Sequence, residues 1–250
     1  MIELIKEDLI GILKKKRFIV LTALLFLAAI GNAVYIKIDY LNDVSYIINM
    51  RFFLKFFFDT LMGIILIISV YHLKYTKFCL TQIEEKGLKR YANIVSKFLS
   101  GSILLICAYT LMCLLILFLG AVMGADFSSY EVETIVLMMF WGCMGAIGLY
   151  ALALFFLTLF AFPVFPAILY AAVTISAPIV LALTCYEDFY PLIGLATPKY
   201  LAEVNFTKAA FGVSTLPFLL AWIIETGIMI LLSIVVFRLK KIKKKEAPGD

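Results

Sequence analysis

Most of the chain is divided into long apolar blocks, and the shorter segments between them carry nearly all of the charge. A membrane-spanning α-helix needs about 20 consecutive apolar residues, and each block is close to that length. We therefore predict an all-α integral membrane protein that forms a single transmembrane domain over residues 1–250. Its six transmembrane helices are expected at about 18–38, 52–71, 98–122, 134–156, 164–184 and 216–237.

The boundary between the fourth and fifth predicted spans is not marked by charge. Residues 134–184 form one apolar run, roughly twice as long as a bilayer-spanning helix needs to be. Pro163 and Pro166 lie in its middle, and proline breaks a helix because it has no backbone N–H and its ring clashes with the preceding turn. We therefore predict a tight cytoplasmic turn, after which the fifth span begins near Val164.

Residues 2–17 show a different pattern, with apolar residues repeating at the helical period rather than in a block. This predicts an amphipathic helix that lies along the membrane surface, with Lys14–Arg17 as a basic anchor at anionic headgroups. The apolar face of this helix is expected to consist of Ile2, Ile5, Leu9, Ile12 and Leu13.

The composition agrees with a membrane protein and excludes several other classes. Hydrophobic residues make up 64% of the chain and charged residues 16%, whereas soluble domains are about 45–50% apolar and 25% charged. A soluble enzyme, a disordered chain and a disulfide scaffold are thereby excluded. The five cysteines have no CxxC spacing, and we expect them to pack as small apolar side chains.

The distribution of basic residues predicts the orientation. Of the 22 Lys and Arg residues, five lie in the N-terminal segment, six in the 72–97 loop and six in the tail, which leaves five for the opposite side. Lys and Arg favour cytoplasmic loops, so both termini, including the basic tail 238–250, are expected in the cytoplasm. We expect a multi-pass protein of a cell membrane, namely the bacterial cytoplasmic membrane.

Two segments between the predicted spans are long enough for structure of their own. The cytoplasmic loop 73–97 has a helical pattern, and it is either a solvated connector or the place where a cytoplasmic partner binds. The external segment 185–215 mixes Pro and Tyr with few charges, which favours short helices at the outer interface, arranged as a lid or a re-entrant element.

Glu225 is the one acidic residue deep inside a predicted span. Intramembrane ionisable residues are costly and face a cavity or a neighbouring helix. Glu225 is therefore either a carboxylate on a translocation path or an acid that is protonated or paired for structural reasons. Asp59 lies four residues after Lys55, which predicts an ordinary ion pair, and the single histidine, His72, predicts an interfacial residue rather than a metal or catalytic site.

The layout resembles the membrane subunit of a type 2 ATP-binding cassette (ABC) transporter. The features that carry the resemblance are the amphipathic N-terminal helix with its basic cluster, six spans, a charged internal loop, a short fourth-to-fifth turn and a long outer fifth-to-sixth segment. The resemblance implies that residues 2–17 are the elbow helix and that roughly 80–91 form the coupling helix that docks on the ATPase. The implied ATPase-coupling residues are Gln82, Glu84, Glu85, Gly87 and Arg90.

The resemblance also implies partners. The chain has no G-x-x-x-x-G-K-[ST] phosphate-binding loop, so we expect a transport subunit without enzyme activity, with no cofactor or metal of its own. ATP and Mg would be bound by a separate ABC ATPase, expected in two copies, and the second permease subunit would be identical or homologous. Small permeases of this build resemble exporters of lantibiotics, phenol-soluble modulins and other antimicrobial peptides, so we expect export of an amphipathic or hydrophobic peptide. The alternative is a secondary transporter or channel driven by an ion gradient through Glu225.

Overall fold

A computed structural model describes residues 1–39, 46, 50, 53–74, 91–124, 129–160, 163–183 and 216–239. Within these ranges the regular secondary structure is helical throughout, which confirms the predicted all-α class. Four helices of the described ranges are long and apolar enough to cross a membrane, which is the hallmark of a membrane protein. They cover Lys16–Ile36, Tyr91–Met123, Met139–Phe160 and Trp222–Leu239.

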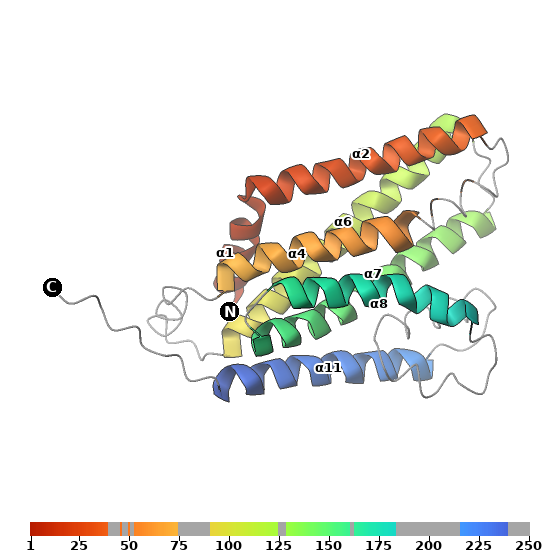
Figure 1. Ribbon diagram of the computed structural model, residues 1–250. Helices are drawn as coiled ribbons and strands as arrows, with labels where there is room; N and C mark the ends of the chain where they lie inside the picture. The colour runs from red at the N-terminus through yellow and green to blue at the C-terminus, as the bar shows by residue number, and fades with distance from the viewer. Residues whose placement is uncertain are drawn as a thin grey trace.

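The helices follow the apolar blocks of the sequence, and the second block is divided between a π-helical turn and an α-helix. Two shorter apolar helices, Asp59–Val70 and Val164–Ser176, lie in the second and fifth blocks. In Figure 1 the long helices run roughly along one direction, and α1 turns away from them at one end of the bundle. The elements are α1 (Ile2–Leu13), α2 (Lys16–Asp39), η1 (Phe53–Phe58), α4 (Asp59–Lys74), α6 (Tyr91–Met123), α7 (Ser129–Phe160), α8 (Val164–Leu183) and α11 (Leu216–Leu239).

Helix α7 packs against four other helices, namely α11, α6, α8 and α4. The largest fully buried side chains include Tyr150 of α7, Tyr170 of α8 and Phe58 of η1. The outward faces of α2 and α11 instead expose large apolar side chains such as Leu27 and Leu231. Apolar exposure on this scale is expected where hydrocarbon, rather than water, surrounds the helices.

The connection between α7 and α8 is short. Helix α7 ends at Phe160 and α8 begins at Val164, where the two prolines of the sequence place the start of a helix. The backbone N–H of Ala167 donates to the Pro163 carbonyl at 3.1 Å, so Pro163 closes the first turn of α8. The ring of Phe165 packs edge-on against Phe160, with centroids 4.9 Å apart, which holds the two helix ends together.

The predicted apolar face of the N-terminal helix only partly coincides with the face that packs against the bundle, which shares Ile12 with it. Helix α1 buries a stripe formed by Leu4, Asp8 and Ile12, while Ile2 and Leu13 remain exposed. The apolar pattern left out Asp8 because it selects residues by hydropathy alone. Asp8 is on the inner side, where a basic partner from α6 compensates for its burial.

Candidate functional site

The predicted ATPase-coupling residues, Gln82, Glu84, Glu85, Gly87 and Arg90, lie outside the described residues, as does the external segment 185–215. The two helices on either side of the predicted coupling loop are described, since α4 ends at Lys74 and α6 begins at Tyr91. The candidate site is therefore built from the base of α6, which directly follows the loop.

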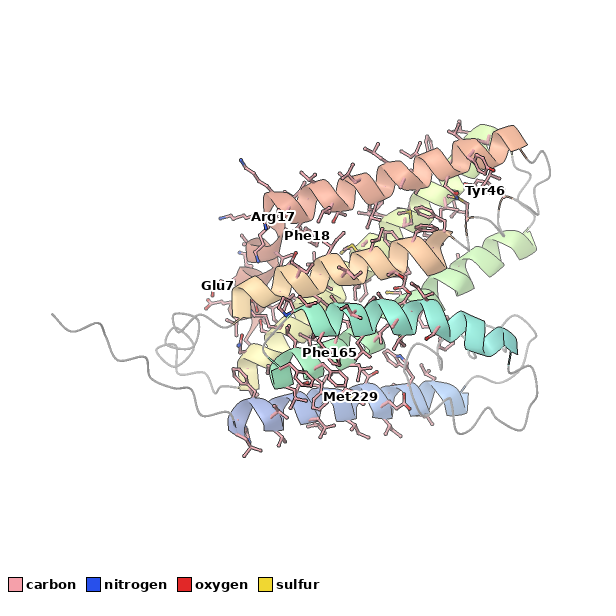
Figure 2. The ribbon with its side chains drawn as sticks, in the orientation of Figure 1. Glu7, Arg17, Phe18, Tyr46, Phe165 and Met229 are labelled. Atoms are coloured by element: carbon pink, nitrogen blue, oxygen red, sulfur yellow. The ribbon has the colours of Figure 1, made fainter. Side chains whose placement is uncertain are left out.

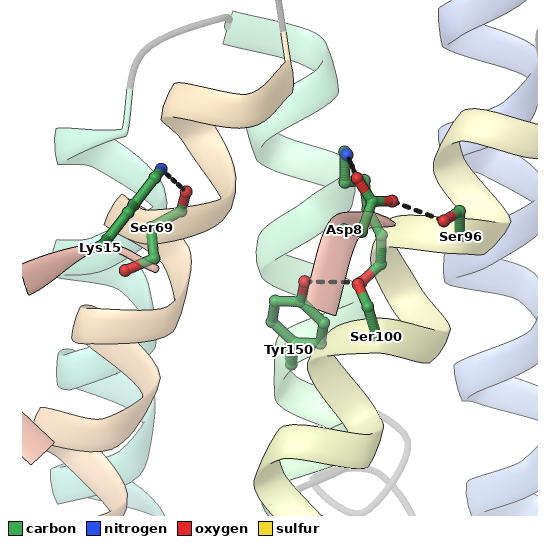
Figure 3. Close-up of polar contacts among 7 residues, drawn as sticks. Asp8, Lys15, Ser69, Ser96, Ser100 and Tyr150 are labelled. Atoms are coloured by element: carbon green, nitrogen blue, oxygen red, sulfur yellow. Dashed lines mark hydrogen bonds and ion pairs between the residues drawn. The ribbon is translucent and has the colours of Figure 1, made fainter. Parts of the chain in front are cut away.

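Asp8 and Lys97 form a buried ion pair between α1 and α6. Their side chains are 8% and 3% exposed, and the Lys97 ammonium donates to Asp8 Oδ1. The other carboxylate oxygen, Oδ2, accepts a hydrogen bond from the Ser96 hydroxyl. Both oxygens of Asp8 are thus bonded to α6, as Figure 3 shows. We call this set of residues, together with Tyr150, the α1–α6 junction.

Tyr150 brings α7 into the α1–α6 junction. Its hydroxyl donates to the backbone carbonyl of Lys97 at 3.0 Å, and its ring stacks on Phe98 with centroids 6.4 Å apart. The approach is possible because residue 101 is glycine, where a Cβ atom would overlap the ring of Tyr150. Closely packed side chains therefore connect α1, α6 and α7 at the base of α6.

A second contact ties the start of α2 to α4. Lys15, between α1 and α2, donates from Nζ to the Ser69 carbonyl at 2.6 Å (Figure 3). Burial, and to a smaller extent the charge of Lys97, lowers the pKa of Lys15 below its usual range. By contrast, Glu7 and Arg17 project outward at this end of the molecule (Figure 2). The bundle end near α1 therefore combines buried, paired charges with an exposed charged surface.

Helix α11 also reaches the base of α6. The Arg238 guanidinium lies over the ring of Tyr91, 5.5 Å from its centroid, a cation–π contact between the last turn of one helix and the first turn of the other. The first turns of α6, immediately after the loop 75–90, are thus contacted by α1, α7 and α11. The sequence pattern missed this arrangement, although the i, i+4, i+8 spacing of Leu4, Asp8 and Ile12 was the signal that could have revealed it.

A second buried carboxylate lies inside the bundle. Asp59 is 1% exposed, and it accepts a hydrogen bond from the Tyr170 hydroxyl at 3.3 Å and is hydrogen-bonded with Tyr109. Gly63 makes room for this arrangement, because a Cβ atom there would overlap the ring of Tyr170. The side chain of Lys55 lies outside the described residues, so the expected pairing of Asp59 with Lys55 stays a prediction.

Glu225 lies on α11 beside the buried face of that helix. Neither of its carboxylate oxygens is accessible, and neither has a hydrogen-bond partner within the described part of the chain. Trp222 and Thr226, which are 8% and 6% exposed, likewise have unpartnered polar atoms there. Ile224 is 60% exposed on the other side of α11. Glu225 is therefore turned away from the outer surface, and none of the described residues supplies a counter-charge beside it.

Replacing Glu225 with Leu distinguishes a carboxylate on a translocation path from an acid that is needed for structural reasons. We expect the variant to be more stable, because an unsatisfied buried polar group costs about 1–3 kcal/mol and the substitution removes it. The measurement is the midpoint of thermal unfolding in detergent, with Ile224→Leu on the exposed face of α11 as the control. A lower midpoint for Glu225→Leu would instead identify Glu225 as a structural acid with a partner.

Metal binding finds no support among the residues that the structure describes, because no group of three His, Cys, Asp or Glu side chains could hold an ion there. The described cysteines, Cys107, Cys113 and Cys143, are free thiols on α6 and α7. Comparison with known proteins adds no relative, since the chain matches no family model and no curated protein sequence.

Proposed function

We propose that this chain is the membrane-spanning permease subunit of an ATP-driven ABC exporter. The observation that carries the proposal is the α1–α6 junction. An amphipathic N-terminal helix lies at one end of the bundle and is held by a buried ion pair, Asp8–Lys97, seven residues into the helix that follows the predicted coupling loop. A transport subunit driven by a separate ATPase needs such a rigid connection between the loop that receives the motion and the helices that move.

The proposal assigns six spans to the protein, with both termini in the bacterial cytoplasm. Helices α2, α6, α7 and α11 supply four spans, and η1 with α4, and α8, supply the other two. The distribution of Lys and Arg supports this orientation, because it places the loop 75–90 and the tail on the same side as α1.

In the proposed mechanism, ATP is bound by the partner subunits and the cargo is transported by the permease subunits. Two copies of a partner ATPase bind ATP with Mg and close on each other, and the coupling residues Gln82, Glu84, Glu85, Gly87 and Arg90 receive that movement. The α1–α6 junction passes it to α6 and α7, and two permease subunits, identical or homologous, alternate between inward-open and outward-open states. This chain carries no ATPase motif, so the energy comes from its partner.

The proposed cargo is an amphipathic or antimicrobial peptide. The described interior is apolar and aromatic, and the carboxyl of Glu225, which has no hydrogen-bond partner among the described residues, would attract a cationic group on such a peptide. The same carboxyl favours the second candidate function, a secondary transporter or channel in which Glu225 binds and releases the driving ion. The two candidates differ in whether the chain requires an ATPase.

Affinity purification of the full chain from its native membranes in mild detergent tests the proposal. We expect a stoichiometric ATP-binding protein to co-purify, and to be lost when Glu84, Glu85 and Gly87 are replaced together, because these residues are proposed to form the docking surface. The matched control replaces Glu131 and Glu133 with Ala, since the proposal places them on the opposite side of the membrane. A folded chain that purifies without any ATPase would overturn the proposal and favour the ion-driven alternative.

A further inference from the structure

A cavity of about 380 Å³ lies between α6 and α7. Its walls are almost entirely apolar and include Tyr109 and Cys113 from α6, and Met139, Phe140, Cys143 and Met144 from α7. The volume is within the range of about 300–1,000 Å³ that is typical of small-ligand sites. The cavity is therefore large enough for a ligand and has walls suited to hydrocarbon.

Both hydroxyl groups in the wall of the cavity already have hydrogen-bond partners within the protein. The Thr110 hydroxyl donates to the Ile106 carbonyl of its own helix at 2.8 Å, and the Tyr109 side chain is hydrogen-bonded with Asp59. A polar ligand would lose its hydrogen bonds to water here and gain none, which is unfavourable. An apolar chain gains dispersion contacts with the walls and has no hydrogen bonds to lose.

The mouth of the cavity opens on the outer surface of the bundle. Three of its lining residues, Ile106, Val136 and Phe140, are 49%, 50% and 50% exposed. They belong to α6 and α7, both of which contain segments apolar enough to cross a bilayer. Whatever enters the cavity therefore comes from the hydrocarbon that surrounds these helices.

The cavity lies deep in the membrane. Cys113, the lining residue of α6 that is nearest to the end of this helix at Met123, precedes that end by ten residues, which is about 15 Å along a helix. The hydrocarbon core of a bilayer is about 30 Å thick, so the cavity lies near the middle of the bilayer. A lipid chain whose headgroup stays at the membrane surface reaches this depth.

The inner wall is held in place before any ligand arrives. The ring of Tyr109 packs edge-on against Phe58, with centroids 5.3 Å apart, and Tyr109 is only 4% exposed. Gly142 lies opposite, where an added Cβ would be 3.2 Å from the Tyr109 ring. These contacts fix the position of Tyr109 in the inner wall of the cavity.

We propose that this cavity binds one acyl chain of a bilayer lipid, which enters sideways between α6 and α7. The inference rests on the lining of the cavity and the position of its mouth, and it holds whether or not the chain is an ABC permease. We refer to the cavity as the acyl-chain site.

Photo-crosslinking of the full chain in lipid nanodiscs tests the acyl-chain site. The probe is a phosphatidylcholine with a diazirine on one acyl chain, and the crosslinked peptides are identified by mass spectrometry. We expect labelling concentrated at Tyr109–Cys113 and Met139–Met144, and we expect Cys113→Phe, which fills the cavity, to reduce it at least five-fold. The matched control is Cys107→Phe, the same change at an exposed position of the same helix, which should leave the labelling unchanged.

A second variant shows whether a loss of labelling results from a blocked cavity or from misfolding of the Cys113→Phe protein. Ile106→Trp places a bulky side chain at the exposed rim, where it blocks entry without crowding the interior, and we expect the same loss of labelling. Equal labelling of all lipid-facing helices, or labelling at the cavity that persists in both folded variants, would overturn the proposal. So would labelling that appears only with a free amphipathic peptide probe and not with the lipid.

Discussion

Replacing Lys97 with Met is expected to destabilise the protein by about 3–5 kcal/mol, because removal of one member of a buried ion pair leaves the other charge uncompensated. Asp8 would keep its hydrogen bond from Ser96 but lose the only charged partner that the described structure gives it. The measurement is thermal unfolding of the purified protein in detergent. Lys14→Met, at an exposed position at the end of α1, should cause little change.

The double variant Asp8→Leu with Lys97→Met distinguishes a lost charge partner from lost packing. When both charges are removed, the cost of burying them disappears as well, and such replacements are often neutral or stabilising. We therefore expect the double variant to be more stable than Lys97→Met alone. Additive destabilisation by the two substitutions would contradict the interpretation of the α1–α6 junction as a buried ion pair.

Gly63→Ala is expected to destabilise the protein by about 1–3 kcal/mol, the usual cost of forcing an additional group into a packed interior. The added methyl group would overlap the ring of Tyr170, which is fully buried and hydrogen-bonded to Asp59 and therefore has no space into which to move. Unfolding of the purified variant in detergent, monitored by circular dichroism, measures the change.

Gly227→Ala is the matched control, because it makes the same substitution inside a helix where nothing lies within 4 Å of the added atom. Alanine is a better helix former than glycine by about 1 kcal/mol, so this variant should be equally or more stable than the unmodified protein. If both variants behaved alike, the close approach of α4 and α8 at Gly63 would not contribute to stability.

The helices could be predicted from the sequence because each one is determined by residues within its own segment. An apolar block of sufficient length has to be helical in a bilayer, where every backbone group needs an internal partner. Likewise, Pro163 and Pro166 determine the start of α8 through the geometry of the proline ring itself. No knowledge of neighbouring segments was required for either prediction.

The polar contacts between helices could not be predicted because the residues that form each contact are far apart in the sequence. Asp8 and Lys97 are 89 positions apart, and Asp59 and Tyr170 are 111 apart, so no local pattern connects them. The amphipathic rule placed Asp8 on the outside because it treats each charge as solvated. Only the folded bundle shows that this charge has a partner. The buried but unpartnered oxygens of Glu225 belong to the same category, since a sequence cannot show which helix covers them.

Helix α6 is longer than a membrane is thick. Its 33 residues extend for about 50 Å, whereas the hydrocarbon core measures about 30 Å. Because Lys97 is near its beginning, the contact with α1 would act, in the proposed transport cycle, as a fulcrum close to one end of a rigid rod. A small sideways displacement before Tyr91 would be converted into a larger and opposite displacement at Met123, on the far side of the fulcrum. The length of a single rigid helix would then amplify the displacement, which a flexible connector would not do.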